Sequence, residues 1–271
     1  MADVFLFIQH GWKNIWRQKI IWLYSIPPIL DQLFNILPVK RAAAPLSSFI
    51  FMVESIIFVV LSYVGMIGVP YLAYRFLIGK PATIKETSFA VNKFSGRIIG
   101  CSCLGLLVMS PFLFWALAVS MNISTHTFQF TYKAILIILP LSIFTALWQF
   151  TLVTFFENDW GIRQGLDKAW NLFKSHFGVL AILGLTLTTA LRAYSAMSGI
   201  LTVLIQSGID INSISGLDLF NPYASLSKSL LFVLINGIGQ TILTPLSASI
   251  FISAYLKYSD AKLPFEMRVR W

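Results

Sequence analysis

Charged side chains are scarce in this sequence. Only 11% of its 271 residues are Asp, Glu, Lys or Arg, whereas 57% are hydrophobic and the mean hydropathy is +0.76. A typical soluble domain carries about 25% charged residues, because its surface faces water. The shortage excludes an ordinary soluble fold and, together with the long apolar runs described below, predicts an all-α integral membrane protein.

Cysteine is nearly absent as well, and the two that exist, Cys101 and Cys103, lie in one apolar run. Residues two apart on a helix point in different directions, so we expect neither a disulfide nor a metal pair. The three histidines, His10, His126 and His176, have no second ligand at metal-binding spacing. Phosphate-binding glycine loops, nucleophile elbows and paired catalytic carboxylates are also missing. We therefore expect no enzymatic activity, no metal and no cofactor.

Long apolar runs are what the sequence has in abundance. A transmembrane helix needs about 20 mostly apolar residues, and five stretches meet that length easily. A sixth contains prolines and polar side chains, so we expect a kinked helix that packs among its neighbours and is shielded from lipid. The six predicted spans are Ile20–Val39, Ser48–Ile78, Arg97–Met121, Ala134–Phe156, Phe177–Ile205 and Leu226–Leu256.

The net charge of +9 is unevenly distributed along the chain. Fifteen lysines and arginines fall in the segments around 1–19, 75–97, 157–175 and 257–271, four fall on the opposite side, and Arg192 lies within a span. Because cations favour the cytoplasmic side, we predict six spans in the cell membrane with both termini cytoplasmic. If the first span does not cross, the N-terminus alone moves outside. Anionic headgroups of the bilayer, rather than nucleic acid, are the expected partners of these cations.

Some of the basic connectors have the pattern of amphipathic helices. Apolar and polar side chains occupy opposite faces in 161–175 and again in the N-terminal 18 residues, and 83–95 is a poorer version. Such helices lie in the headgroup plane, with aromatic rings at the acyl boundary and cations towards phosphate. Docking onto a partner protein is the second interpretation. The candidate headgroup-binding residues are Trp12, Lys13, Trp16, Arg17, Arg163, Lys168, Trp170 and Lys174.

These segments also indicate an internal repeat within a single membrane domain, residues 1–271. Trp12, Asn92 and Trp170 occupy corresponding positions, 80 and then 78 residues apart, and each precedes a span out and a span back. We therefore predict three parallel repeats of an amphipathic helix plus a transmembrane hairpin. The units are 1–80, 81–158 and 159–258, and residues 259–271 form a basic cytoplasmic tail.

Charged and polar residues inside the apolar runs are the candidates for a functional site. Arg192 lies near the middle of the fifth span, where an unpaired charge costs about 2.5–3.5 kcal/mol on insertion scales. We expect it to face the bundle interior and to pair with Asp31 or Glu54, alongside Gln32 and Asn35. Two interpretations stay open here: an ion pair that only fixes helix register, and a polar cavity that handles a substrate or an ion.

Two short stretches carry a family resemblance, namely Gly11–Arg17 and Glu157–Lys174. With them the chain resembles the multi-span bacterial membrane domain that some proteins carry fused to a glycerophosphodiester phosphodiesterase, together with its stand-alone relatives. The second stretch lies between a returning span and the next outgoing one, as that family's cytoplasmic connector does. The resemblance implies membrane residence and a role in lipid or envelope handling, without a defined reaction. Spans and connectors use nearly all residues, so we expect no phosphodiesterase domain here.

Two classes of function remain. The first is a non-enzymatic multi-pass membrane protein that binds lipid or a partner protein in the cell envelope. The second is an ABC-type permease subunit that works with a separate ATPase, because six spans and cytoplasmic helices between spans two and three and spans four and five are typical of such subunits. Phospholipid retained through purification would favour the first class, and a copurifying ATPase subunit the second.

Overall fold

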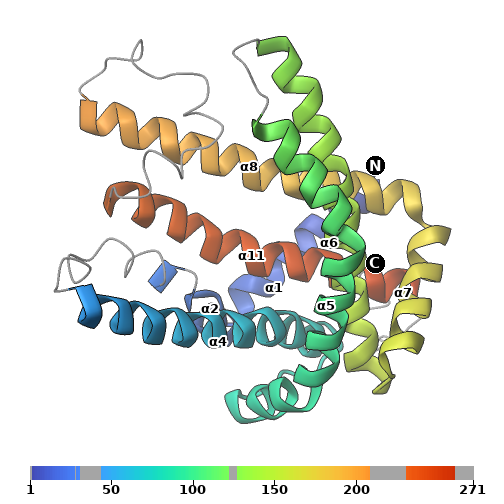
Figure 1. Ribbon diagram of the computed structural model, residues 1–271. Helices are drawn as coiled ribbons and strands as arrows, with labels where there is room; N and C mark the ends of the chain where they lie inside the picture. The colour runs from blue at the N-terminus through green and yellow to red at the C-terminus, as the bar shows by residue number, and fades with distance from the viewer. Residues whose placement is uncertain (1, 28, 31–43, 122–126, 208–229, 260–271) are drawn as a thin grey trace.

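The computed structural model describes residues 2–27, 29–30, 44–121, 127–207 and 230–259. Every regular element in these residues is an α-helix. Figure 1 labels the helices, which are α1 (Ala2–Arg17), α2 (Ile20–Ser25), α4 (Ala44–Leu77), α5 (Ile84–Met121), α6 (Thr127–Asn158), α7 (Ile162–Ser175), α8 (Phe177–Ser207) and α11 (Leu230–Tyr258).

Four of the described helices are long and apolar enough to cross a membrane. They are Ser55–Leu77 within α4, Ile84–Phe112 within α5, Phe177–Gly199 within α8 and Leu231–Tyr258 within α11. These four correspond to the second, third, fifth and sixth predicted spans. The first predicted span is described only as far as Leu30, and the side chains of the fourth only from Pro140 onwards. The number six therefore stays a prediction.

α11 is the central helix of the described structure. It packs against α1, α2, α4, α6 and α8, and every residue from Pro245 to Leu256 is buried. Its N-terminal half is less enclosed and exposes Leu234 and Ile238. In Figure 1, α4, α8 and α11 run across the view, whereas α5 and α6 run up it. The main hydrophobic core consequently surrounds the C-terminal half of α11.

α1 packs along α11 in the opposite direction. Lys257 Nζ donates a hydrogen bond of 2.7 Å to Asp3, and Asn14 Nδ2 donates one of 3.0 Å to the Ser249 hydroxyl. The inward face of α1 recurs at the three- and four-residue spacing that a helix requires. Its buried members are Val4, Phe7, Gly11, Asn14 and Ile15, and Gln18 directly after the helix is buried too. The prediction places the apolar face of this segment at the acyl boundary, whereas in the structure Val4, Phe7 and Ile15 on that side of α1 are buried against the bundle.

The segment after α1 continues along the same neighbour. A Cβ added at Gly237 of α11 would lie 3.0 Å from side-chain atoms of Ile29. Tyr24 of α2 fits against Gly65 and Gly68 of α4, and a Cβ at Gly65 would stand 2.5 Å from the Tyr24 carbonyl oxygen. Small residues allow such close approach of helices in a membrane protein. Two segments therefore pack along α11: α1, which comes before the predicted first span, and the first residues of that span, up to Ile29.

The middle amphipathic segment is not a separate helix. Thr83 and Glu86 form a capping box, in which the Glu86 carboxylate accepts from the Thr83 N–H at 2.8 Å and the Thr83 hydroxyl accepts from the Glu86 N–H at 3.3 Å. From this cap α5 continues without interruption to Met121. α1 and α7, by contrast, end at Arg17 and Ser175 before the next helix begins. The three predicted units thus differ at their starts.

Candidate functional site

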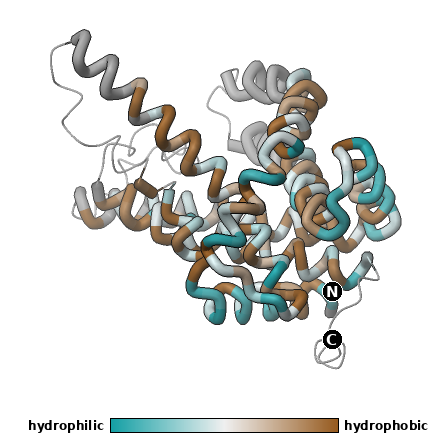
Figure 2. The backbone as a smooth tube through the Cα atoms, turned by 90° about the horizontal axis from the view of Figure 1, so that it is seen from below, coloured by the Kyte–Doolittle hydropathy of each residue, from teal (hydrophilic) through white to brown (hydrophobic). Residues whose placement is uncertain are grey.

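Cationic side chains gather at one end of the molecule, which we call the basic end. It comprises α1, α7, the start of α5 and the C-terminal ends of α4, α6 and α11. Figure 2 shows hydrophilic residues on the right and lower sides of that view, whereas the long helices on the left are mostly hydrophobic. The lysines and arginines of the basic end are Lys13, Arg17, Lys19, Arg75, Lys80, Lys85, Lys93, Arg97, Arg163, Lys168, Lys174 and Lys257.

Glu157, near the end of α6, is the centre of a cluster that joins three helices. Lys168 Nζ of α7 donates to Glu157 Oε2 at 2.9 Å, and the Tyr255 hydroxyl of α11 donates to the same oxygen at 2.6 Å. The Lys168 ammonium also lies 4.4 Å from the ring centroid of Trp160, a favourable cation–π distance. The Glu157 side chain is only 16% exposed, so water screens this charge-assisted network little.

Asp159 lies in the turn between α6 and α7 and connects it to α5. Its carboxylate pairs with Lys93 Nζ at 2.9 Å and with the Arg97 guanidinium, which also donates to the Trp160 carbonyl oxygen at 3.1 Å. The hydrogen bonds from Lys93 and Arg97 hold the pKa of the Asp159 carboxyl below its ordinary value. With φ of 56°, Asp159 is in the left-handed region, which Asp and Asn tolerate better than most residues.

A third cluster fixes the beginning of α1. The Asp3 carboxylate accepts from Lys257 Nζ at 2.7 Å and from the Tyr258 hydroxyl at 3.4 Å. The hydrogen bond from Lys257 lowers the pKa of the Asp3 carboxyl. The His176 ring, at the junction of α7 and α8, stacks on Tyr258 with centroids 4.0 Å apart. Through these contacts α1, α8 and α11 are held together at the basic end.

The predicted headgroup residues divide into two groups in the structure. One of them, Lys168, is engaged by Glu157 and Trp160 and so belongs to the internal network. The other seven are exposed at the basic end, namely Trp12, Lys13, Trp16, Arg17, Arg163, Trp170 and Lys174.

α7 directs most of its apolar stripe inwards. A Cβ at Gly165 would lie 2.5 Å from the Phe155 ring, and Ala169 and Phe173 are buried. The Thr154 hydroxyl donates to the Gly165 carbonyl oxygen at 3.2 Å, which fixes the helix on α6. The prediction that this stripe meets acyl chains is therefore wrong for these positions, because the protein's own core covers them.

Three tryptophans form a ladder at the junction of α1 and α2. The ring centroids of Trp12 and Trp16 are 5.8 Å apart, and those of Trp16 and Trp22 are 5.5 Å apart. Trp12 and Trp16 are 48% and 55% exposed. The exposed cations Lys13 and Arg17 alternate with these rings along α1. Exposed indole rings among cations are typical of the membrane–water interface, because tryptophan has an apolar body and a polar N–H.

The predicted intramembrane polar cluster is only partly covered by the structure. Asp31, Gln32 and Asn35 lie outside the described residues. Glu54 falls within α4 and Arg192 within α8, but their side chains are outside the described part as well. The pairing of Arg192 with an acidic residue therefore stays a prediction.

Polar side chains of the central helix help to line two internal cavities. Between α6, α8 and α11 is a cavity of about 350 Å³ whose polar walls are Thr145, Thr188, Ser195, Gln240 and Ser247. A smaller cavity of about 180 Å³ lies between α2, α4, α6 and α11. Serine, threonine and glutamine are common on packed membrane helices, so their presence alone does not indicate a cavity.

Several buried amide atoms near α11 have no hydrogen-bond partner among the described residues. They are Asn14 Oδ1, both polar atoms of the Gln18 side chain, and Gln149 Oε1. An unsatisfied buried polar atom costs about 1–3 kcal/mol. The interior around α11 therefore retains unused capacity for hydrogen bonding to a polar molecule.

No family model, curated protein or solved structure matches this chain. The functional argument consequently depends on the geometry of the residues described above. The resemblance to the phosphodiesterase-linked membrane domain stays a prediction.

Proposed function

We propose that this protein is a non-enzymatic multi-pass membrane protein that binds anionic phospholipid at its basic end. The observation that carries the proposal is the ladder of Trp12, Trp16 and Trp22, whose first two rings are exposed, with the exposed cations Lys13 and Arg17 next to them in the sequence of α1. Indole rings favour the headgroup level of a bilayer, and each nearby cation gains about 1 kcal/mol from an anionic surface.

The packing of α1 supports a fixed rather than a transient contact with the headgroups. Its inward face is held by Asp3–Lys257 and Asn14–Ser249, so the tryptophans and cations stand on a helix that cannot rotate freely. A preorganised surface loses less conformational freedom on binding.

A thermal-unfolding experiment in detergent tests this proposal. Phosphatidylglycerol should raise the unfolding temperature of the wild-type protein more than phosphatidylcholine does, because ligands that bind only the folded state stabilise it. The triple variant K13Q/R17Q/K19Q should lose most of this difference between the lipids. The charge-conserving variant K13R/R17K/K19R is the matched control and should retain it. Equal stabilisation by both lipids in the wild-type protein would contradict the proposal.

Copurification from the native membrane separates this function from the permease alternative. Phosphatidylglycerol retained by the wild-type protein but depleted in K13Q/R17Q/K19Q supports lipid binding. An ATPase subunit retained at a fixed ratio, with no enrichment of anionic phospholipid, favours the permease instead.

A further inference from the structure

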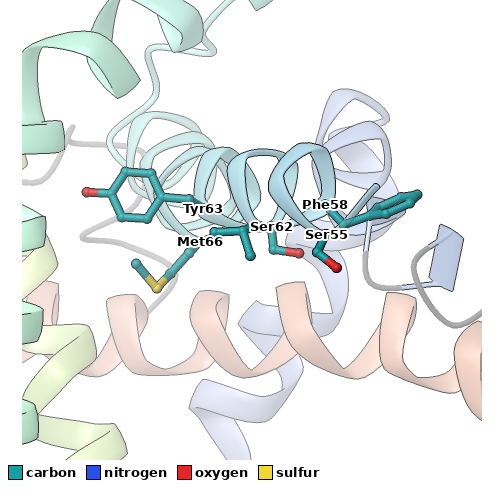
Figure 3. A pocket seen from close by; sticks show the side chains of 6 residues that line it. Ser55, Phe58, Ser62, Tyr63 and Met66 are labelled. Atoms are coloured by element: carbon teal, nitrogen blue, oxygen red, sulfur yellow. The ribbon is translucent and has the colours of Figure 1, made fainter. Parts of the chain in front are cut away.

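A groove along one face of α4 adjoins the smaller internal cavity. The groove, of about 450 Å³, is lined by Ser55, Phe58, Val59, Ser62, Tyr63 and Met66. Ser62 and Met66 also line the internal cavity, so the two spaces share a wall. Figure 3 shows Ser55, Ser62 and Met66 on the same side of α4, with Phe58 towards one end of the groove and Tyr63 towards the other.

The outer part of this path is exposed and apolar among the described residues. Its residues follow the three- to four-residue spacing of a single helix face within the spanning stretch Ser55–Leu77. Val59 at its rim is 69% exposed, and its neighbours Ile56 and Val60 are also exposed and apolar. Tyr63 is held in place because its hydroxyl donates to the Ser95 carbonyl oxygen of α5 at 2.7 Å. An apolar chain could therefore lie in the groove without leaving the hydrocarbon region.

The inner part is polar and uncharged. Hydroxyl-bearing Tyr24, Ser25 and Thr244 line the internal cavity with Gln149. Gln149 Oε1 is buried and has no hydrogen-bond partner among the described residues, so it is an acceptor that a ligand's donor can satisfy. Among the residues that the structure describes, none that lines the groove or the cavity is charged. A phosphate or carboxylate would find no cation among these described lining residues, and burying an unpaired charge is strongly unfavourable.

We propose that the groove and cavity together bind a neutral amphiphile with a hydroxyl head group, of the diacylglycerol or long-chain alcohol class. The hydroxyl donates a hydrogen bond to Gln149 Oε1, and a hydrocarbon chain lies along α4 over Val59. The ligand reaches the site sideways from the bilayer, past Ser62 and Met66, which line both spaces. This site is separate from the headgroup contact at the basic end. It binds a neutral ligand, whereas the basic end binds an anionic one.

Photolabelling in lipid nanodiscs tests the site. The probe is a diacylglycerol with a diazirine in one acyl chain, and wild-type labelling should fall within residues 55–66. The variant S62F, which fills the passage, should reduce this labelling about tenfold. S102F is the matched control, since Ser102 is half-buried on the neighbouring α5 and lines neither space, and it should be labelled like the wild-type protein.

A second variant examines the head-group contact without filling the cavity with a ring. Q149L removes the acceptor and should weaken competition by unlabelled diacylglycerol about tenfold, as expected for one lost hydrogen bond to a buried group. Phosphatidylglycerol should not compete. Labelling outside α4, unchanged labelling of S62F, or equal competition by phosphatidylglycerol would each overturn the proposal. K13Q/R17Q/K19Q should keep full labelling, which separates this outcome from any failure at the basic end.

Discussion

The Tyr255 hydroxyl donates to the Glu157 carboxylate with 2.6 Å between the oxygens, across 98 positions of sequence. This bond joins the central helix to the end of α6, and Lys168 of α7 shares its acceptor. Three helices therefore depend on one carboxylate oxygen at the basic end.

Tyr255→Phe should lower the free energy of unfolding by about 1.5–3 kcal/mol, because a hydrogen bond to a charged group is lost in a buried setting. Thermal unfolding in detergent measures the loss. The matched control is Tyr71→Phe, since the Tyr71 ring packs on Phe156 at 5.4 Å and no hydrogen bond of its hydroxyl is part of this network. Equal losses in the free energy of unfolding would show that the hydrogen bond to Glu157 does not add to the stability of the protein.

Gly65→Ala should destabilise the protein by about 1–3 kcal/mol, because overpacking forces neighbouring atoms apart. The added Cβ would meet the Tyr24 carbonyl oxygen, which is backbone and cannot rotate away. Gly96→Ala is the control, since a Cβ there meets nothing within 4 Å. On the exposed surface of a helix that change should be neutral or stabilise by about 0.5–1 kcal/mol. If both variants lowered the unfolding temperature to the same extent, the close contact between Gly65 and the Tyr24 carbonyl oxygen would be contradicted.

Asp159→Asn should remove a stabilising contribution that depends on pH. Pairing with Lys93 and Arg97 lowers the pKa of the folded carboxyl below 3.8, so the contribution is full above the unfolded value and is lost as pH falls through the lowered folded value. The difference in unfolding temperature between the wild-type protein and the variant should therefore be present at neutral pH and disappear as pH falls through the lowered pKa of the folded carboxyl. Asn retains the left-handed turn at this position. A difference that persists undiminished in acid would exclude the carboxylate as its source.

The tryptophan ladder should be quenched by lipids brominated near the headgroup more than by lipids brominated at the chain end. The fluorescence of Trp12 and Trp16 is obtained as the difference between the wild-type protein and W12F/W16F. Both rings are exposed, so lipid bromines can reach them. Trp148→Phe serves as a control, since that ring stacks on Phe144 within α6. Stronger quenching of the ladder by chain-end bromines would place it deep in the bilayer and contradict the proposed interface.

Asn171→Cys reports the orientation of the protein. Asn171 is exposed on α7, and both native cysteines are free, so they are first replaced by alanine. An impermeant maleimide should leave the variant unlabelled in intact cells and label it after permeabilisation, because the basic end is predicted to be cytoplasmic. Labelling in intact cells would reverse the topology.

Hydropathy identifies the helices that contact lipid but not the way in which α1 packs. The stretch Ala2–Arg17 contains enough polar residues to score as a surface helix, yet Asn14 is buried against Ser249 of α11. A buried polar side chain and an exposed one look the same in a hydropathy pattern. The sequence therefore predicts the helical membrane class and four of the spans. It does not predict that α1 packs along α11.

The candidate sites differ in how visible they are in sequence. Helical periodicity puts Trp12 on one apolar face with Val4, Ile8 and Ile15, whereas the structure buries Ile15 and leaves Trp12 exposed. Gln149 and Ser62 could not be paired, because they lie on different helices and become neighbours only through tertiary packing. For the same reason Glu157, Lys168 and Tyr255 give no local signal of their network.

The position of α11 at the centre has a consequence for biogenesis. Among the described helices it is the last to leave the ribosome, yet α1, α4 and α8 all bury side chains against it. These earlier helices must wait in the membrane with incomplete neighbours until translation delivers their common partner. Nascent chains arrested before residue 230 should therefore be the form that quality-control proteases and insertion chaperones recognise.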